Sequence, residues 1–237
     1  MRLNKYIGES GLCSRREADR LIAEGRVTLN GEPARTGDQV ADGDEVRVDQ
    51  VQLRPRVVAV GTRQHVYIAL NKPVGITCTT ESGVKGNIVD FIDHRERIFP
   101  IGRLDKDSEG LILLTSNGDI VNELLRSENG HEKEYLVGVN QAVTNEFLSA
   151  MARGVRVRGE ITKPCRTGKI ARYGFRIVLT QGLNRQIRLM CEALGYKVKQ
   201  LRRVRIVNIK LGVLRIGQWR NLTDAELRGL LPERTRW

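Results

Sequence analysis

Three carboxylates lie close together in one short polar segment of the sequence. The run FPIGRLDKDSEGLILLTSNGD occupies residues 99–119, and Asp105, Asp107 and Glu109 fall within five positions of it. Gly102 and Gly110 flank this polar loop, and an apolar run follows directly. A carboxylate can act as a nucleophile or base, ligate a cation, or bond to its own backbone in a turn. This loop is therefore the first candidate for chemistry.

One of these uses is disfavoured by spacing. Asp105, Asp107, Glu109 and Gly110 match a calcium loop only in part, because the twelfth position, where a bidentate glutamate is needed, is Ser116. An apolar strand also begins where such a loop should continue. Spacing alone does not separate a catalytic aspartate from a turn residue, so both interpretations remain at this point.

The cysteines and histidines form no metal-binding pattern. No Cys-x-x-Cys pair exists, and the three histidines are scattered. We therefore expect reduced thiols, no metal and no cofactor. The start, MRLNKYIGES, lacks the apolar run of a signal peptide, and no stretch has the roughly 18 apolar residues of a membrane helix. These features predict a cytoplasmic protein with no membrane partner.

Positive charge is concentrated in one part of the chain. The 237 residues carry a net charge of +12, and residues 151–220 hold 18 basic and 2 acidic side chains. The rest of the chain is close to neutral or slightly acidic. A stretch of one sign indicates a surface that binds a polyanion, and RNA or DNA is the usual one.

The N-terminal residues predict a small module of two helices followed by strands. Apolar spacing over residues 3–10 predicts a helix, and Ser14-Arg15-Arg16-Glu17 is a capping box for a second helix that ends at Gly25. Asn30-Gly31 predicts a hairpin turn, and Val46 and Val48 begin a further alternating strand. Residues 49–64, with Pro55 and Gly61, are expected to form a linker.

The remaining chain predicts strands interrupted by single helices. Strands are expected at 66–70, 110–115, 133–139, 175–180 and 205–211, and helices at 120–126 after the cap Asp119, at 144–152 and at 184–194. Without a regular strand–helix alternation, this order predicts an α+β domain with a mixed, mostly antiparallel sheet. We therefore expect two domains, an RNA-binding module with its linker at 1–60 and a larger domain at 61–237.

Two resemblances add to these observations. Residues 2–48 resemble the small RNA-binding module of ribosomal small-subunit protein four, and this favours phosphate contacts by Arg15, Arg16 and Arg20, which lie off the apolar face of the second helix. GRLDKDSEGLILLTSNGD resembles the signature of the RsuA-type pseudouridine synthases, whose catalytic aspartate corresponds to Asp105. The resemblance implies the pseudouridine synthase fold for the larger domain.

Further segments resemble that family in the expected order. They are LNKPVGITCTT at 70–80, HEKEYLV at 131–137 and QGLNRQIRLMCEALGYKVKQLRRVRI at 181–206. Leu183 and Leu189 replace arginines that are frequent in the family. Leu183 and the run at 129–135 are similar to the RluF subgroup, which modifies large-subunit ribosomal RNA and in some members a tRNA anticodon.

The resemblance assigns roles to the matched residues. Asp105 is the expected nucleophile, Arg188 its ion-pair partner, and Tyr135 the ring that stacks on the flipped base. Arg185 is the rival partner, because it could lie on the same side of its helix. The other expected contacts are to substrate, by Arg103, Leu201 and Arg185, and to RNA backbone, by Lys197, Lys199, Arg202, Arg203 and Arg205.

The sequence thus predicts an RNA pseudouridine synthase that is monomeric and needs no cofactor. Large-subunit ribosomal RNA is the expected substrate, with a tRNA anticodon as a second one. The alternative is a non-catalytic RNA-binding or ribosome-assembly protein, for which the N-terminal module and the basic stretch would suffice.

Overall fold

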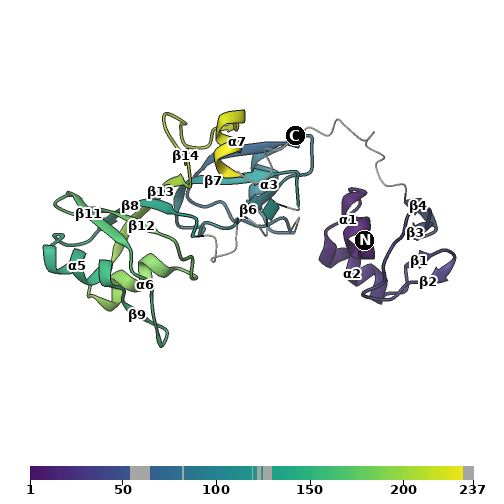
Figure 1. The fold of residues 1–237 in the computed structure, drawn as a ribbon, viewed down its shortest axis with the longest axis horizontal. Helices are drawn as coiled ribbons and strands as arrows, with labels where there is room; N and C mark the ends of the chain where they lie inside the picture. The colour runs from purple at the N-terminus through teal and green to yellow at the C-terminus, as the bar shows by residue number, and fades with distance from the viewer. Residues whose placement is uncertain (54–64, 82, 119, 122–123, 125–129, 232–237) are drawn as a thin grey trace. The chain divides into compact units, whose positions relative to one another are not determined.

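The chain divides into two compact units, Met1–Gln64 and His65–Trp237 (Figure 1). The structure is a computed structural model that describes residues 1–53, 65–81, 83–118, 120–121, 124 and 130–231. Within those ranges no helix is long and apolar enough to cross a membrane. Each unit has its own core.

The first unit has the predicted order of two helices and a hairpin. The helices are α1 (Leu3–Glu9) and α2 (Arg15–Ala23), and the strands are β1 (Val27–Leu29), β2 (Glu32–Pro33), β3 (Val46–Val48) and β4 (Val51–Leu53), in the sheet order β2-β1-β3-β4. Asn30 and Gly31 have φ of 53° and 87°, which confirms the tight hairpin turn. Part of the expected linker is instead β4, because Asp49 and Gln50 turn the chain with φ of 50° and 66°.

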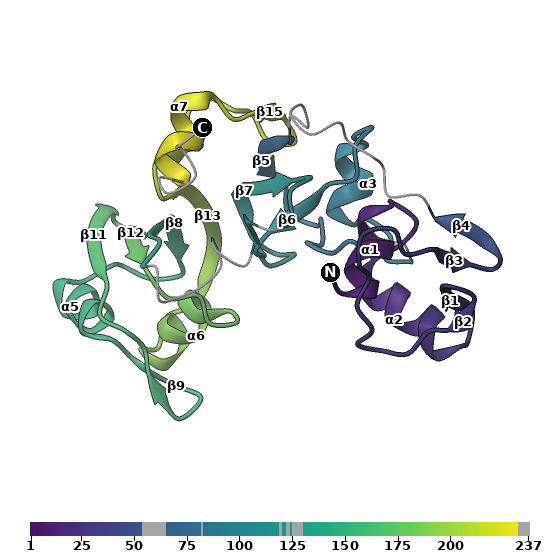
Figure 2. The same cartoon turned by 45° about the vertical axis from the view of Figure 1, so that its right-hand side comes forward.

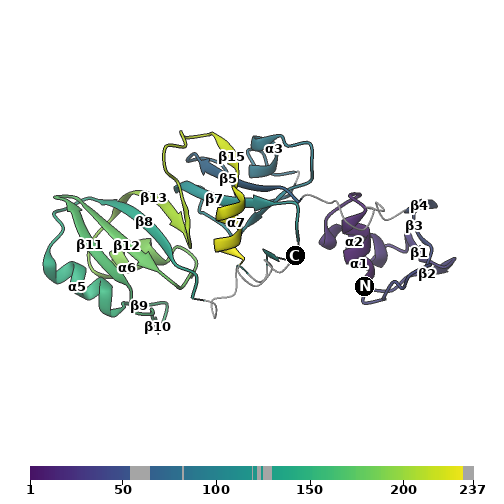
Figure 3. The ribbon, with the colours of Figure 1, turned by 45° about the horizontal axis from the view of Figure 1, so that its top comes forward.

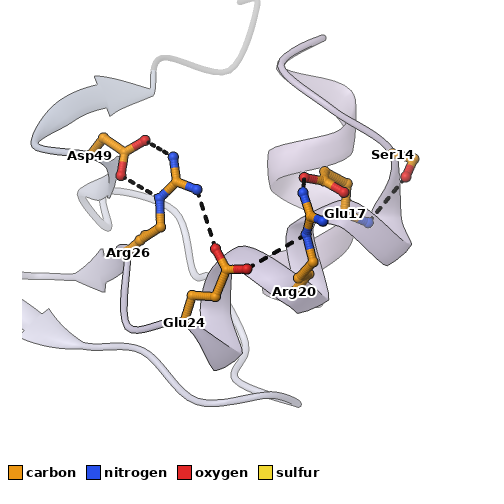
Figure 4. Close-up of polar contacts among 6 residues, drawn as sticks. All are labelled: Ser14, Glu17, Arg20, Glu24, Arg26 and Asp49. Atoms are coloured by element: carbon orange, nitrogen blue, oxygen red, sulfur yellow. Dashed lines mark hydrogen bonds and ion pairs between the residues drawn. The ribbon is translucent and has the colours of Figure 1, made fainter. Parts of the chain in front are cut away.

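Only half of the predicted capping box forms at α2. Ser14 accepts a hydrogen bond from the Glu17 amide at 3.1 Å, but the Glu17 carboxylate turns to Arg20 instead of to the Ser14 backbone (Figure 4). Arg26 donates to Asp49 through Nε at 2.7 Å and so ties the segment between α2 and β1 to the β3–β4 turn (Figure 4). The unit is held by the buried faces of both helices packed on β1 and β3.

The second unit contains one large sheet in the order β11-β12-β8-β13-β7-β5-β15. Its strands are β5 (Tyr67–Lys72), β7 (Glu109–Thr115), β8 (Lys133–Val139), β11 (Arg166–Ala171), β12 (Gly174–Leu179), β13 (Val198–Ile206) and β15 (Trp219–Asn221), with β6 (Phe99–Ile101) and β14 (Ile209–Lys210) paired beside them. The β13–β7 pair is parallel, and the other described pairs are antiparallel. The predicted mixed, mostly antiparallel sheet is confirmed.

Strand β13 joins two halves of this sheet (Figure 2). On one side, α5 (Asn145–Arg153) and α6 (Gln186–Ala193) pack on β8, β12 and β13 (Figure 3). On the other side, β5 and β7 are buried on both faces, by α3 (Ile88–Ile92) on one and α7 (Asp224–Leu230) on the other. This double burial explains why residues 111–114 form an uninterrupted apolar run.

Several boundaries differ from the sequence prediction. The strand expected at 205–211 is two strands, because Val207 has a φ of 51° and turns the chain between β13 and β14. Helix α6 begins at Gln186 because Arg185 is left-handed, with a φ of 54°. Of the helix expected at 120–126, residues 120, 121 and 124 are helical, whereas its cap Asp119 lies outside the described residues.

Candidate active site

Asp105 lies in a turn between β6 and β7. The Ser108 amide donates to the Asp105 carbonyl at 3.0 Å, and this bond closes the turn Asp105–Ser108. The Asp105 side chain is 28% exposed, whereas that of Asp107 is 67% exposed. Of the two aspartates in the loop, Asp105 is thus the one partly enclosed by protein.

Side chains from β13 and α6 hold this loop in place. Arg203 on β13 donates from Nε to the Leu111 carbonyl at 2.6 Å and from Nη1 to the Arg103 carbonyl at 3.4 Å. Arg188 on α6 donates from Nη2 to the Asp107 carbonyl at 2.9 Å and to Ser108 Oγ at 3.1 Å. Hydrogen bonds from guanidinium groups are among the stronger ones in proteins, so the loop is fixed from two directions.

A third segment, which follows β5, holds the loop from another side. The Gly75 amide donates to the Lys106 carbonyl at 2.8 Å. Cys78 Sγ donates to the Leu104 carbonyl at 3.2 Å, and burial raises the pKa of this thiol, so it stays protonated and can act as a donor. Residues 75 and 78 thus bind the backbone on both sides of Asp105.

Gly110 allows β7 and β13 to approach each other at the end of the loop. Its φ is 107°, and a Cβ built on it would lie 2.3 Å from the Arg203 carbonyl oxygen. A side chain there would clash with backbone that cannot move away without breaking the β13–β7 pair. The glycine that ends the polar loop in the sequence therefore has a packing role.

The ion pair expected between Asp105 and Arg188 is not formed. The Arg188 guanidinium is occupied by the backbone and the serine of the loop. Arg185, the rival partner, has its Nη1 4.0 Å from Asp105 Oδ2 and 3.6 Å from Asp107 Oδ2. The left-handed backbone of Arg185 places it at the start of α6, where its side chain reaches the carboxylates of the loop.

Tyr135 lies on β8 where two hydrophobic cores meet. It is partly buried and packs against both the α5–α6 core and the α3 core. The Arg203 guanidinium carbon lies 6.0 Å from the centre of the Tyr135 ring. Leu201, two residues earlier on β13, is 6% exposed and belongs to the α5–α6 core. Arg203 therefore contacts both the Asp105 loop and the aromatic ring.

Lys72 is a buried cation below the same loop. It is 0% exposed and donates from Nζ to the carbonyls of Pro73 at 2.8 Å and Ile76 at 2.9 Å. Burial lowers the pKa of Lys72, and the negative charges of Asp105 and Asp107 oppose that shift in part. The loop thus places carboxylates close to a cation that has no contact with solvent.

The residues expected to bind RNA backbone separate into two groups. Lys197 and Lys199 are exposed, Arg202 is half-buried, and Arg15, Arg16 and Arg20 are exposed in the first unit, with Arg20 paired to Glu17 and Glu24. Two of the expected cations are engaged within the protein. Arg203 is 3% exposed and is occupied by backbone carbonyls, and Arg205 is paired with Glu132 and Glu134.

The exposed cations continue along one surface from the loop. Beside α6 lies a hollow of about 370 Å³ lined by Arg185, Arg188, Tyr196 and Lys197, with Glu192 as its carboxylate. Arg103, at the start of the loop, is also exposed. In the described residues no group of three or more His, Cys, Asp or Glu side chains could hold a metal ion.

Sequence reasoning missed the inward roles of Lys72 and Arg203. A strand correctly placed at 198–206 would have shown Leu201 and Arg203 on one face, because side chains two apart point the same way. No sequence signal of this kind exists for Lys72, which follows Asn71 at the end of β5 and whose partners are backbone carbonyls.

The fold places a partly enclosed aspartate in a loop that Arg188 and Arg203 hold through hydrogen bonds. Residues 66–193 match the family model for RNA pseudouridylate synthase, and residues 1–46 match that for the S4 domain. The chain belongs to the RNA pseudouridylate synthase family. It is an isomerase that acts on uridine in RNA.

Individual relatives agree with this family. The chain is 57% identical to dual-specificity RNA pseudouridine synthase RluF of Escherichia coli K12, over 96% of this chain and 77% of the relative. It is 32% identical to ribosomal large subunit pseudouridine synthase B of Bacillus subtilis, over 97% and 95% of the two chains. A crystal structure of a pseudouridylate synthase superposes with a TM-score of 0.70 at 31% identity and covers 97% of this chain and 99% of the other.

Proposed function

We propose that this enzyme converts a uridine of large-subunit ribosomal RNA to pseudouridine, with a tRNA anticodon as a second substrate. The 57% identity to a dual-specificity synthase supports both substrates, and the likeness to a large-subunit enzyme supports the first. A non-catalytic RNA-binding protein would not need a carboxylate loop held from three directions. The enzyme acts as a monomer in the cytoplasm.

Asp105 is the catalytic nucleophile in this proposal. The reaction breaks the N1–C1′ bond of the uridine, rotates the base and forms a C5–C1′ bond, after which C5 loses its hydrogen as a proton and N1 carries one. Composition does not change, so no oxidant, reductant or cofactor is required. The observation that carries the assignment is the fixed, partly enclosed position of Asp105 in a loop anchored by Arg203, Arg188 and Gly75.

The side chains near Asp105 have distinct roles in this proposal. Tyr135 stacks on the flipped base, and Leu201, a member of the core against which Tyr135 packs, lies near that base. Arg185 supplies the positive counter-charge near Asp105, while Arg188 acts as a positioning residue through the backbone of the loop. Arg103, Arg15, Arg16, Arg20, Lys197, Lys199 and Arg202 contact RNA.

The two aspartates of the loop provide a matched test. RNA tritiated at C5 of uridine is incubated with the parent, Asp105→Asn or Asp107→Asn, using large-subunit rRNA transcript and tRNA in parallel. Release from the parent should vanish with Asp105→Asn and persist with Asp107→Asn, whose side chain is 67% exposed. Turnover by Asp105→Asn comparable to that of the parent would remove Asp105 from this role.

A further inference from the structure

A second hollow lies at the start of α6, and two of its lining residues, Asn184 and Gln186, flank Arg185 in the sequence. It has a volume of about 260 Å³ and lies between the start of α6 and the hairpin of β9 (Arg156–Val157) and β10 (Glu160–Ile161), which packs beside α6 (Figures 1 and 3). Its apolar walls are Val157, Leu183 and Leu189. Leu183 and Leu189 are the two positions at which the sequence departs from the arginines frequent in its family.

The walls of this hollow are held by hydrogen bonds. Gln186 is 4% exposed, and its Oε1 accepts from the Leu183 amide at 3.0 Å. Its Nε2 donates to Gln181 Oε1 at 3.2 Å. Arg158, left-handed in the hairpin turn, donates from Nη2 to Asn184 Oδ1 at 3.3 Å. The hollow is therefore formed in the protein without a ligand.

The size and charge of the hollow suit one planar base of an RNA strand. Sites for drug-sized ligands measure about 300–1,000 Å³, so this smaller one suits a single ring system. Aliphatic walls can contact the faces of a base, and Asn184 offers an amide to its edge. Arg156, Arg158 and Lys163 are exposed on the segments that form the hollow, and Glu160 is the carboxylate among them. The resulting excess of positive charge favours contacts with phosphates.

Position favours a base close to the target. Asn184 lines the hollow, and the next residue, Arg185, reaches Asp105 with its Nη1 at 4.0 Å from Oδ2. One side chain thus separates the wall of the hollow from the proposed nucleophile. An enzyme that flips its target base also disturbs the stacking of the adjoining nucleotides. We propose that this hollow, the flanking-base hollow, binds an unstacked base adjoining the target uridine. The proposal rests on the proposed function and extends it to the substrate sequence around the target.

The test is a double cycle between RNA and protein. The RNA is the shortest fragment of large-subunit rRNA transcript that binds the Asp105→Asn protein, and each of its nucleotides is replaced in turn by an abasic one. One abasic position should weaken binding about tenfold, within the range for one lost base contact. Leu183→Ala, added to the Asp105→Asn protein, should weaken binding of the intact RNA by a similar factor. It should not further weaken binding of the RNA that is abasic at the sensitive position. Leu183 is 39% exposed, so the change leaves folding intact.

Two controls keep the result decisive. Ile161→Ala truncates a 62% exposed aliphatic side chain on β10 that does not line the hollow, and it should leave every affinity unchanged. Leu189→Ala should repeat the behaviour of Leu183→Ala. The proposal would be overturned if the losses of affinity from the protein change and the RNA change multiplied, or if no abasic position weakened binding. Because binding is measured without turnover, a parent that releases no tritium would defeat the proposed function and leave this cycle interpretable.

Discussion

Replacing Arg203 by methionine tests whether this arginine belongs to the interior or to the RNA surface. Its guanidinium donates to two backbone carbonyls, of Leu111 and Arg103, and is 3% exposed. Methionine has a similar length but no donor, so the Leu111 carbonyl loses a buried hydrogen bond and the Arg103 carbonyl loses a partly buried one. The arginine therefore supports the loop that carries Asp105.

The magnitude follows from these contacts. A buried acceptor without a partner costs about 1–3 kcal/mol, and Arg203→Met affects two acceptors. Removal of the buried charge of Arg203 offsets part of their combined cost. We expect the free energy of unfolding to fall by about 2–4 kcal/mol. Loss of loop position by about 1 Å should lower kcat/KM by on the order of a hundredfold, while affinity for RNA stays close to that of the parent.

Three measurements separate the interior role from phosphate binding. Both tryptophans, Trp219 and Trp237, belong to the second unit, so tryptophan fluorescence in urea reports the unfolding of that unit. Tritium release gives kcat/KM, and the salt dependence of RNA affinity counts phosphate contacts. Lys199→Met is the control, because Lys199 is exposed on the same strand. It should lower the salt slope by about one and leave stability within about 0.5 kcal/mol.

The opposite pattern would refute the reasoning. If Arg203→Met unfolds at the urea midpoint of the parent and lowers the salt slope as Lys199→Met does, the side chain binds phosphate and does not support the loop. Loss of stability together with full activity would show that the loop keeps its position without this arginine.

Three further outcomes follow from the same unit. Gly110→Ala should destabilise by at least about 3 kcal/mol in urea, since its Cβ would lie 2.3 Å from the Arg203 carbonyl oxygen; Gly195→Ala, with open space around it, should cost only about 1 kcal/mol. Burial lowers the pKa of Lys72, so between that lowered value and pH 10.5 the unfolded chain binds more protons than the folded chain. In that pH range the urea midpoint of the parent should rise with pH, and that of Lys72→Met should not. Arg220 donates two hydrogen bonds of 2.7 Å to the Glu226 carboxylate and lowers its pKa from 4.5 to about 2. About 1–2 kcal/mol of stability, discounted for solvent, should therefore be lost in acid titrations from pH 4.5 towards 2, and this loss should be absent in Glu226→Gln.

Much of the fold could be predicted because local signals agreed with the packing. Ser14 starts α2, Thr144 starts α5, and Asn30-Gly31 turns the first hairpin, each through its own side chain or backbone. Short strands such as β6 and β15 escaped prediction because three residues carry no readable period. Their position depends on partners far along the chain.

The site was predicted less completely than the fold. Motif order identified Asp105 and Tyr135 as candidates, and these assignments stay predictions until turnover is measured. The partner of Asp105 could not be read from spacing, because Arg185 and Arg188 differ by one helical turn and the left-handed backbone at Arg185 decides which one reaches the carboxylate. The count of charges could not place the Arg203 side chain, since net charge does not report which side of a strand a cation faces.

The anchoring of the Asp105 loop has a consequence for the order of events during synthesis. Arg188 and Arg203 bind backbone about eighty to a hundred residues earlier in the chain. When only the first 180 residues have been synthesised, the nascent chain thus contains Asp105 but neither Arg188 nor Arg203. Strand β13, which joins the two halves of the sheet, is synthesised later still. The proposed centre therefore cannot form before Arg203 has been added, and a shorter nascent chain that contacts RNA lacks both arginines that anchor its Asp105 loop.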